Sequence, residues 1–387
     1  MRWGILGSGK IASDFATALQ SHVPDAQLQA VASRRTGPSD EFAAKFSIPL
    51  AFSGTDAYRD LAASDEVDVC YIATLNPSHK ADAIACLEAG KHVVVEKPMA
   101  LSLDDAKEMI DVARRNDRFL MEGMWTRFFP AVRAARRLIA DGEIGSVVHV
   151  QADFGFMCDD PPTSRMFDKA LGGGGLLDIG CYTIDSAAWA FTSTKDRSSQ
   201  ASGKAPRNVT ATGVLCETGV DVSGNIIVDY EGGSAGLLYT LSAQTEEQTT
   251  IWGTHGSIKL HSPAHCPSNL TFQQWSTPSR AEESEPTTIH HPLPAVDEEA
   301  GECYNYPNQQ GFSYQIQAVE DLLMNRQPGE CECPEYTHAE MLTNAATIEA
   351  ARLQMGYTFA HEEAEATVGT DGAVLAPSRR RSRNAKG

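Results

Sequence analysis

The fold of the first half of the chain is decided by the stretch Arg2-Trp3-Gly4-Ile5-Leu6-Gly7-Ser8-Gly9-Lys10-Ile11-Ala12. Its first five residues predict a short apolar strand, and Ile11, Phe15 and Leu19 then recur at helical spacing. The glycine turn between them is typical of a dinucleotide site: Gly7 makes the turn, Gly9 lets a pyrophosphate approach the helix N-terminus, and Ala12 lets the helix pack closely on the strand. The candidate cofactor contacts in this stretch are Gly7, Ser8, Gly9, Lys10 and Ile11.

The end of the second predicted strand, residues 28–33, indicates which dinucleotide is bound. In this kind of sheet the strand usually ends in an acid that binds the ribose 2′-hydroxyl. Here it ends in Ser33-Arg34-Arg35. A hydroxyl and two guanidinium groups suit a 2′-phosphate, so the sequence favours NADP and makes these three residues cofactor contacts. The alternative is that both arginines are simply solvated.

Further strands and helices alternate up to about residue 123, which predicts a doubly wound parallel sheet in a domain over 1–123. Two buried-type strands, 67–73 and 91–95, are each followed by polar residues. Because ligands bind at the carboxyl ends of such strands, we expect these residues to border one crevice, with Lys97 beside the cofactor. The residues are Thr74, Asn76, His79, Glu96 and Lys97.

The second half has a different pattern, with long strands whose apolar residues alternate. It predicts an α+β domain over 124–361, built on a large, mainly antiparallel open sheet. The predicted strands are 147–154, 209–216, 224–230, 235–242, 249–253 and 257–261, and the predicted helices are 132–141, 312–325 and 336–354. Residues 195–208 and 278–302 are interpreted as surface loops. The segment 362–387, which carries the basic run Arg379-Arg380-Arg381, is expected to be a disordered tail.

A run of four glycines, residues 172–175, precedes a predicted helix in this domain. The glycines would let the backbone turn tightly and approach a flat ligand. On the helix, Asp178 and Tyr182 are four residues apart and so share a face, and Asp185 follows three residues later. The alternative is that Tyr182 is a core aromatic residue and Asp178 an ordinary charge near a helix N-terminus.

Composition narrows the function. The 387-residue chain is 42% hydrophobic, enough for two domains, and its net charge of −19 argues against a nucleic-acid partner. No stretch approaches the ~20 apolar residues that cross a bilayer, and the chain starts without a charged leader, so we expect a cytoplasmic protein with no membrane partner. Nine scattered cysteines form no disulfide framework and no zinc motif, so reduced thiols and no metal are expected.

Several of these motifs, taken together and in order, resemble the glucose-fructose oxidoreductase/inositol dehydrogenase/MocA (Gfo/Idh/MocA) family over about residues 1–360. They are Gly7 to Ala12, Thr74 to His79, Glu96-Lys97-Pro98, and Gly173 to Tyr182. Met121 to Pro130, Asp153 to Phe156 and Tyr182 are similar to the branch of dimeric dihydrodiol dehydrogenases and NADP-dependent D-xylose 1-dehydrogenases. The chain departs from that branch at Gly123 and at Met157 to Pro161. The resemblance implies an NADP-dependent oxidoreductase with a Rossmann domain, which often forms a homodimer through the second domain's sheet.

The resemblance also implies roles for single residues. Lys97 matches a lysine that contacts cofactor and substrate, Tyr182 the acid/base, and Asp178 an acid one helical turn earlier. Trp125 and Arg127 match positions that line the cofactor or substrate, and the substrate set is Phe154, Phe156, Arg165, Asp178 and Tyr182.

The implied chemistry is hydride transfer between the nicotinamide and a sugar hemiacetal or secondary alcohol, for which a base must take the hydroxyl proton. Because a free tyrosine has a pKa near ~10, we expect Lys97 to lower the pKa of Tyr182. Two other functions remain open: an NADP-binding sensor without turnover, and a redox-neutral enzyme that holds NAD and acts on glycosides.

Overall fold

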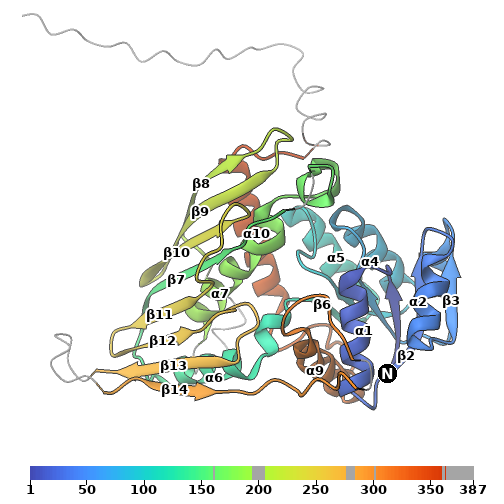
Figure 1. Ribbon diagram of the computed structural model, residues 1–387, viewed down its shortest axis with the longest axis horizontal. Helices are drawn as coiled ribbons and strands as arrows, with labels where there is room; N and C mark the ends of the chain where they lie inside the picture. The colour runs from blue at the N-terminus through green and yellow to red at the C-terminus, as the bar shows by residue number, and fades with distance from the viewer. Residues whose placement is uncertain (160–161, 194–204, 276–283, 300–301, 360–361, 363–387) are drawn as a thin grey trace, which may run out of the picture.

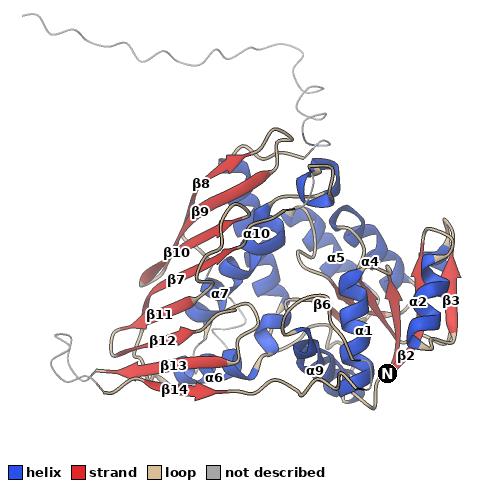
Figure 2. Cartoon of the chain, in the orientation of Figure 1, coloured by secondary structure: helices blue, strands red, loops and turns tan. Residues whose placement is uncertain are grey.

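The computed structural model describes residues 1–159, 162–193, 205–275, 284–299, 302–359 and 362. Two sheets organise them, with helices between and around them (Figures 1 and 2). No helix of the described residues is both long and apolar enough to span a bilayer. All nine cysteines lie in the described part, and each is a free thiol, as the sequence predicted.

The first sheet has six parallel strands in the order β3-β2-β1-β4-β5-β6, which confirms the predicted doubly wound architecture. The strands are β1 (Arg2–Leu6), β2 (Gln27–Ser33), β3 (Leu50–Ser53), β4 (Val69–Ile72), β5 (His92–Val95) and β6 (Leu120–Glu122). The helices are α1 (Lys10–His22), α2 (Pro38–Phe46), α3 (Ala57–Ala63), α4 (His79–Glu88) and α5 (Leu103–Arg115). The strand order reverses between β1 and β4, so a ligand is expected beyond the carboxyl ends of these two strands.

The second sheet has eight strands in the order β14-β13-β12-β11-β7-β10-β9-β8 and is antiparallel except between β7 and β10. The strands are β7 (Val147–Gly155), β8 (Asn208–Leu215), β9 (Asp221–Tyr230), β10 (Gly233–Thr240), β11 (Thr249–Gly253), β12 (Gly256–Leu260), β13 (Asn269–Gln274) and β14 (Thr287–His290). This confirms the predicted α+β domain with a large, mainly antiparallel sheet.

The prediction of a surface loop over 278–302 is wrong for Thr287–His290, which form the edge strand β14. All four of these residues are exposed, so the sequence shows no alternation of apolar residues that would predict a strand. The segment is held as a strand by backbone pairing with β13. Most of the other predicted loop, 195–208, lies outside the described residues, and its last residue begins β8. The predicted tail also lies outside them, apart from Glu362.

Helices cover one face of the second sheet and fill the space between the two sheets (Figure 1). They are α6 (Pro130–Asp141), α7 (Cys181–Thr192) and α10 (His338–Gln354). The remaining long helix, α9 (Phe312–Met324), packs against α1 of the first domain. There Glu320 accepts a hydrogen bond from the Trp3 indole at 2.6 Å and pairs with the N-terminal amine at 2.8 Å. The second half of the chain therefore helps to hold the helix that opens the cofactor site.

Candidate active site

Lys97, Asp178 and Tyr182 lie together between the two domains. The Lys97 ammonium, just beyond β5, donates to the backbone oxygen of Asp178 at 2.6 Å and lies 3.8 Å from its carboxylate. The same ammonium is 5.0 Å from the centre of the Tyr182 ring. Arg165, at the rim, reaches the Asp178 carboxylate at 3.4 Å. Residues from two separate parts of the sequence thus form one cluster of a cation, a carboxylate and a phenol.

The segment that carries Asp178 and Tyr182 starts in an unusual helical form. Leu176–Gly180 is one π-helical stretch that runs directly into α7. Asp221 fixes its start, because its carboxylate accepts a hydrogen bond from the Leu176 N–H at 2.6 Å. π-Helical turns occur often at functional sites.

The idea that the four glycines approach a flat ligand is wrong, because they pack against the protein itself. A Cβ on Gly173 would lie 2.6 Å from the carbonyl oxygens of Arg165 and Met166, and one on Gly175 would lie 2.9 Å from the Tyr239 ring. Gly174 has φ +106°, which side chains other than glycine rarely adopt. The glycines therefore let the start of α7 sit directly on the second sheet.

The Tyr182 hydroxyl accepts a hydrogen bond from the Trp125 indole at 3.1 Å, and Trp125 is itself only 2% exposed. Burial raises the pKa of Tyr182, while the Lys97 charge lowers it and the Trp125 bond lowers it further; the net effect is a pKa above the ordinary value. Lys97 therefore acts in the predicted direction, but burial outweighs it. Burial lowers the pKa of Lys97 itself, and the neighbouring Tyr182 and Asp178 raise it more, so Lys97 is a cation.

Burial also acts on the Asp178 carboxyl and raises its pKa. The charges of Lys97 and Arg165 outweigh that effect and hold the pKa of Asp178 below its usual range. The cluster at neutral pH is therefore an ammonium, a carboxylate and a neutral phenol.

The glycine turn has the geometry of a pyrophosphate site. Gly7 has φ +100°, and a Cβ there would lie 2.6 Å from the Ala73 carbonyl oxygen, so only glycine fits. A Cβ on Gly9 would meet no atom within 4 Å, and α1 begins at Lys10 without a side-chain cap. The free N–H groups of its first turn and the open space beside Gly9, with Ser8 and Ile11 partly accessible, fit an anionic group.

Ser33, the last residue of β2, is buried, and the Arg34 and Arg35 side chains that follow it are exposed. The Arg34 guanidinium lies over the Tyr58 ring, 5.6 Å from its centre. Two cationic side chains are thus available at the predicted 2′-phosphate position.

Three of the polar residues that follow β4 and β5 are hydrogen-bonded to other protein groups. Thr74 donates to Asp82 at 2.8 Å, and Asn76 donates to the Gly172 carbonyl at 2.9 Å. Glu96 is buried and accepts from the Tyr71 hydroxyl at 2.6 Å.

Two predicted ligand contacts are enclosed instead. His79 has no exposed surface, and its ring nitrogens face the carbonyl oxygens of Pro98 and Thr74, so it holds the two loops together. Arg127 is also fully buried and pairs with Asp185 at 2.7 Å and Glu340 at 2.8 Å. Because a buried charge needs partners, these carboxylates draw Arg127 into the core beneath α7 and α10. Because His79 and Arg127 are fully enclosed by protein, the structure does not support the ligand contacts predicted for their side chains.

Two family models match the chain. One, described as an oxidoreductase family with an NAD-binding Rossmann fold, matches residues 1–124, and the other, the family's C-terminal domain, matches residues 132–259. Trans-1,2-dihydrobenzene-1,2-diol dehydrogenase of Sus scrofa is 35% identical over 366 residues, which cover 94% of this chain and 99% of that protein. The chain belongs to the Gfo/Idh/MocA family of oxidoreductases.

Solved structures of this family share the fold. An aldose-aldose oxidoreductase from Caulobacter crescentus matches with a TM-score of 0.73 at 23% identity, over 92% of this chain and 97% of that one. A 3-ketoreductase from Actinomadura kijaniata, solved with NADP, matches with a TM-score of 0.71 at 23% identity, over the same shares of the two chains. At this level of identity the likeness supports the architecture. Membership of the Gfo/Idh/MocA family, predicted from the motifs, is confirmed.

One part of this family member's site has no signal in the sequence. The ring of His265, from the loop after β12, is 5.3 Å from the Tyr182 ring and stacks on Phe154 at 4.6 Å between ring centres. Its Nδ1 contacts the Glu247 carboxylate, from the segment before β11. Both residues lie in irregular segments, so no periodicity and no motif pointed to them. The predicted substrate contacts Phe154 and Phe156 are both partly buried against the core, and the His265 ring adds contacts with Phe154 and Trp125.

Proposed function

We propose that this enzyme transfers a hydride between NADP and a sugar hemiacetal or secondary alcohol, with Tyr182 as acid/base assisted by Lys97. The observation that carries the proposal is the cluster of Lys97, Asp178 and Tyr182 beyond the carboxyl ends of the parallel strands, where this fold binds ligands. A phenol, a fixed cation and a carboxylate at this position serve proton transfer at a reacting hydroxyl.

The residues fit a phosphorylated dinucleotide. The N-terminus of α1 and Gly9 would hold the pyrophosphate, and Ser33, Arg34 and Arg35 would hold the 2′-phosphate. Thr74, Asn76 and Glu96 would border the nicotinamide half. When bound, this cofactor supplies the carbon that accepts or gives the hydride.

The chain's own residues handle the proton. In the oxidation direction Tyr182 acts as the phenolate, which the Lys97 charge stabilises; it takes the hydroxyl proton and becomes the neutral phenol. In the reduction direction the neutral Tyr182 phenol gives its proton to the new alkoxide. Trp125 holds the phenol oxygen by its N–H, and Asp178 holds Lys97 against the ring. Because burial raises the pKa of Tyr182, we expect oxidation to favour high pH and reduction to favour lower pH.

The proposed substrate class rests on the named activities of the relatives. Relatives that share over a third of their residues with this chain are named as trans-1,2-dihydrobenzene-1,2-diol dehydrogenases, and a structural neighbour is named as an aldose-aldose oxidoreductase. We therefore propose a trans-dihydrodiol or an aldose as the substrate, in the cytoplasm, in keeping with nine free thiols.

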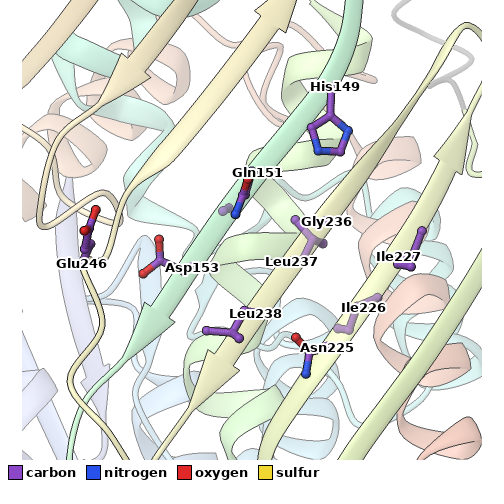
Figure 3. Close-up of a pocket in the computed structure, with 11 residues that line it drawn as sticks. His149, Gln151, Asp153, Asn225, Ile226, Ile227, Gly236, Leu237, Leu238 and Glu246 are labelled. Atoms are coloured by element: carbon purple, nitrogen blue, oxygen red, sulfur yellow. The ribbon is translucent and has the colours of Figure 1, made fainter.

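The outer face of the second sheet is proposed as a homodimer interface. Among the described residues, no helix covers this face, and Ile227 on β9 is 53% exposed while Val214 on β8 is 58% exposed. Figure 3 shows side chains that line the hollow in its centre, among them His149 and Gln151 on β7, Ile227 on β9 and Leu238 on β10. An open apolar sheet face is commonly buried against a second copy.

The test is an activity panel with each cofactor. Absorbance at the reduced-nicotinamide band is followed with NADP or NAD and with D-xylose, other aldoses, or trans-1,2-dihydrobenzene-1,2-diol. We expect reduction of NADP with at least one of these compounds, and reduction at least about 100-fold slower with Tyr182→Phe. A wild-type enzyme that binds NADP but reduces it with none of them would contradict the proposal and favour a cofactor-binding sensor.

A further inference from the structure

His265 and Glu247 form a charged pair beside Tyr182. Their side chains are 16% and 11% exposed, so neither is free in solvent, and neither is sealed in the core. The neighbours of the His265 ring are Tyr182, Phe154 and Trp125. The partly exposed imidazole therefore lies next to the Tyr182 ring.

The surrounding backbone fixes this pair. The Thr126 hydroxyl donates to the carbonyl oxygen of His265, and the Ala264 N–H donates to that of Glu247 at 3.1 Å. The N–H of Glu247 donates to the Asp153 carboxylate at 2.7 Å. Contacts from three separate segments thus hold one imidazole and one carboxylate in place.

Glu247 also has an uncommon backbone conformation. Its φ is +54°, in the left-handed region that disfavours residues other than glycine. Such strain persists only where surrounding contacts hold it, and it is found mainly at functional sites. Here the strained residue is the one whose carboxylate reaches His265. This backbone feature and the ring contacts at Tyr182 are independent observations that point to the same place.

The pair sets the charge of the imidazole. Burial lowers the pKa of His265, but the Cys266 sulfur and the Glu247 carboxylate together raise it to about 9. At neutral pH both ring nitrogens therefore carry hydrogen. Nδ1 is engaged with Glu247, and the one partner of Nε2 among the described residues is the Cys266 sulfur, a weak acceptor at 3.3 Å. A charged N–H with a weak acceptor is left beside the reacting centre.

We infer that His265, held by Glu247, is a specificity-determining residue that makes the site prefer a polyhydroxylated substrate, an aldose, over a dihydrodiol whose ring carries no further hydroxyls. The inference rests on the proposed function and narrows its substrate class. A further sugar hydroxyl accepts the Nε2 hydrogen, whereas an apolar ring leaves that donor covered and unpaired. A site built to hydrogen-bond a hydroxyl discriminates strongly against analogues that lack it.

The test compares two substrates in four proteins. kcat/KM is measured for D-xylose and for trans-1,2-dihydrobenzene-1,2-diol with wild type, His265→Phe, Glu247→Gln and the control His261→Phe. The phenylalanine keeps a ring to stack on Phe154 but has no donor. His261 lies in the same region, with its imidazole bonded to Thr271.

We expect the ratio of kcat/KM for D-xylose to that for the diol to fall about 10–100-fold in His265→Phe, less than the ~10⁴-fold of fully enclosed sites because the pair is partly exposed. Glu247→Gln should shift the ratio less and in the same direction, and His261→Phe should leave it unchanged. Equal loss for both substrates in His265→Phe, which a merely structural role predicts, would overturn the inference, as would an unchanged ratio.

Failure of the proposed function would look different. If the wild type oxidises neither compound, hydride transfer to these substrates is refuted, and binding of the same two compounds to the NADP-saturated protein is measured by calorimetry. A preference for D-xylose that His265→Phe abolishes supports the role of His265, and the absence of such a preference overturns it.

Discussion

Replacing Lys97 by methionine tests how the cluster sets the acidity of Tyr182. The ammonium is 5.0 Å from the centre of the phenol ring. At an effective dielectric constant of about 20, two unit charges at that distance interact by roughly 3 kcal/mol, which corresponds to roughly two pKa units. The Asp178 carboxylate, 3.8 Å from the ammonium, remains in Lys97→Met. We therefore expect a rise of about two units in the pKa of Tyr182.

The direction of the change in the pKa of Tyr182 depends on whether each neighbouring charge favours the phenol or the phenolate. Lys97 stabilises the phenolate, so removing it raises the pKa of Tyr182, and the uncompensated Asp178 raises it further. The assay is the pH profile of kcat/KM in the oxidation direction. The limb on which Tyr182 must lose its proton should move to higher pH in Lys97→Met, and less far in Lys97→Met with Asp178→Asn. Lys80→Met, at a lysine that pairs with Asp105 and Glu108 on the surface, is the control. A limb that stays in place, or moves to lower pH, would refute the reasoning.

Three further predictions concern the cofactor, the core and the assembly. Arg34→Ala with Arg35→Ala should weaken the preference for NADP over NAD by about 1–3 kcal/mol in kcat/KM, and a wild type that works equally well with NAD would contradict it. In Arg127→Met, Asp185 and Glu340 stay buried without their cation, so the free energy of unfolding measured in urea should fall by about 3–5 kcal/mol. A fall below about 1 kcal/mol would contradict this prediction. In sedimentation the wild type should have about twice the 41.7 kDa chain mass and Ile227→Asp should approach the single mass, whereas a wild-type monomer at micromolar concentration would exclude the dimer.

The sequence was informative where the chemistry is local. The glycine turn at Gly7 and Gly9 depends only on adjacent residues, so strand, turn and helix were all predictable from spacing. The alternating strands of the second sheet were predictable for the same reason, since burial on one face leaves a period of two. Lys97 and Tyr182 were singled out by their places after a strand and on a helix face, and their roles came from the family resemblance; the structure places the Lys97 ammonium 5.0 Å from the centre of the Tyr182 ring.

The remaining features depend on contacts between distant segments. Nothing near Arg127 indicates that Asp185 and Glu340 will surround it, since the last is 213 residues away. The glycines before α7 are needed because they pack closely against the Tyr239 ring and the Arg165 backbone. The sequence around these glycines does not reveal those contacts. His265 is brought to Tyr182 by the loop between β12 and β13, and irregular segments carry no period from which a position in space could be read.

The central claim is that the Tyr182 hydroxyl carries the proton of the reaction, and the turnover of Tyr182→Phe tests it most directly. Phenylalanine keeps the ring and its packing against Phe154 and His265, and the change removes only the hydroxyl and its bond from Trp125. The account predicts that kcat falls by roughly 10²–10⁴-fold while NADPH affinity, measured by fluorescence titration, stays near the wild-type value. A folded Tyr182→Phe protein with near-normal turnover on the substrates of the wild type would contradict it.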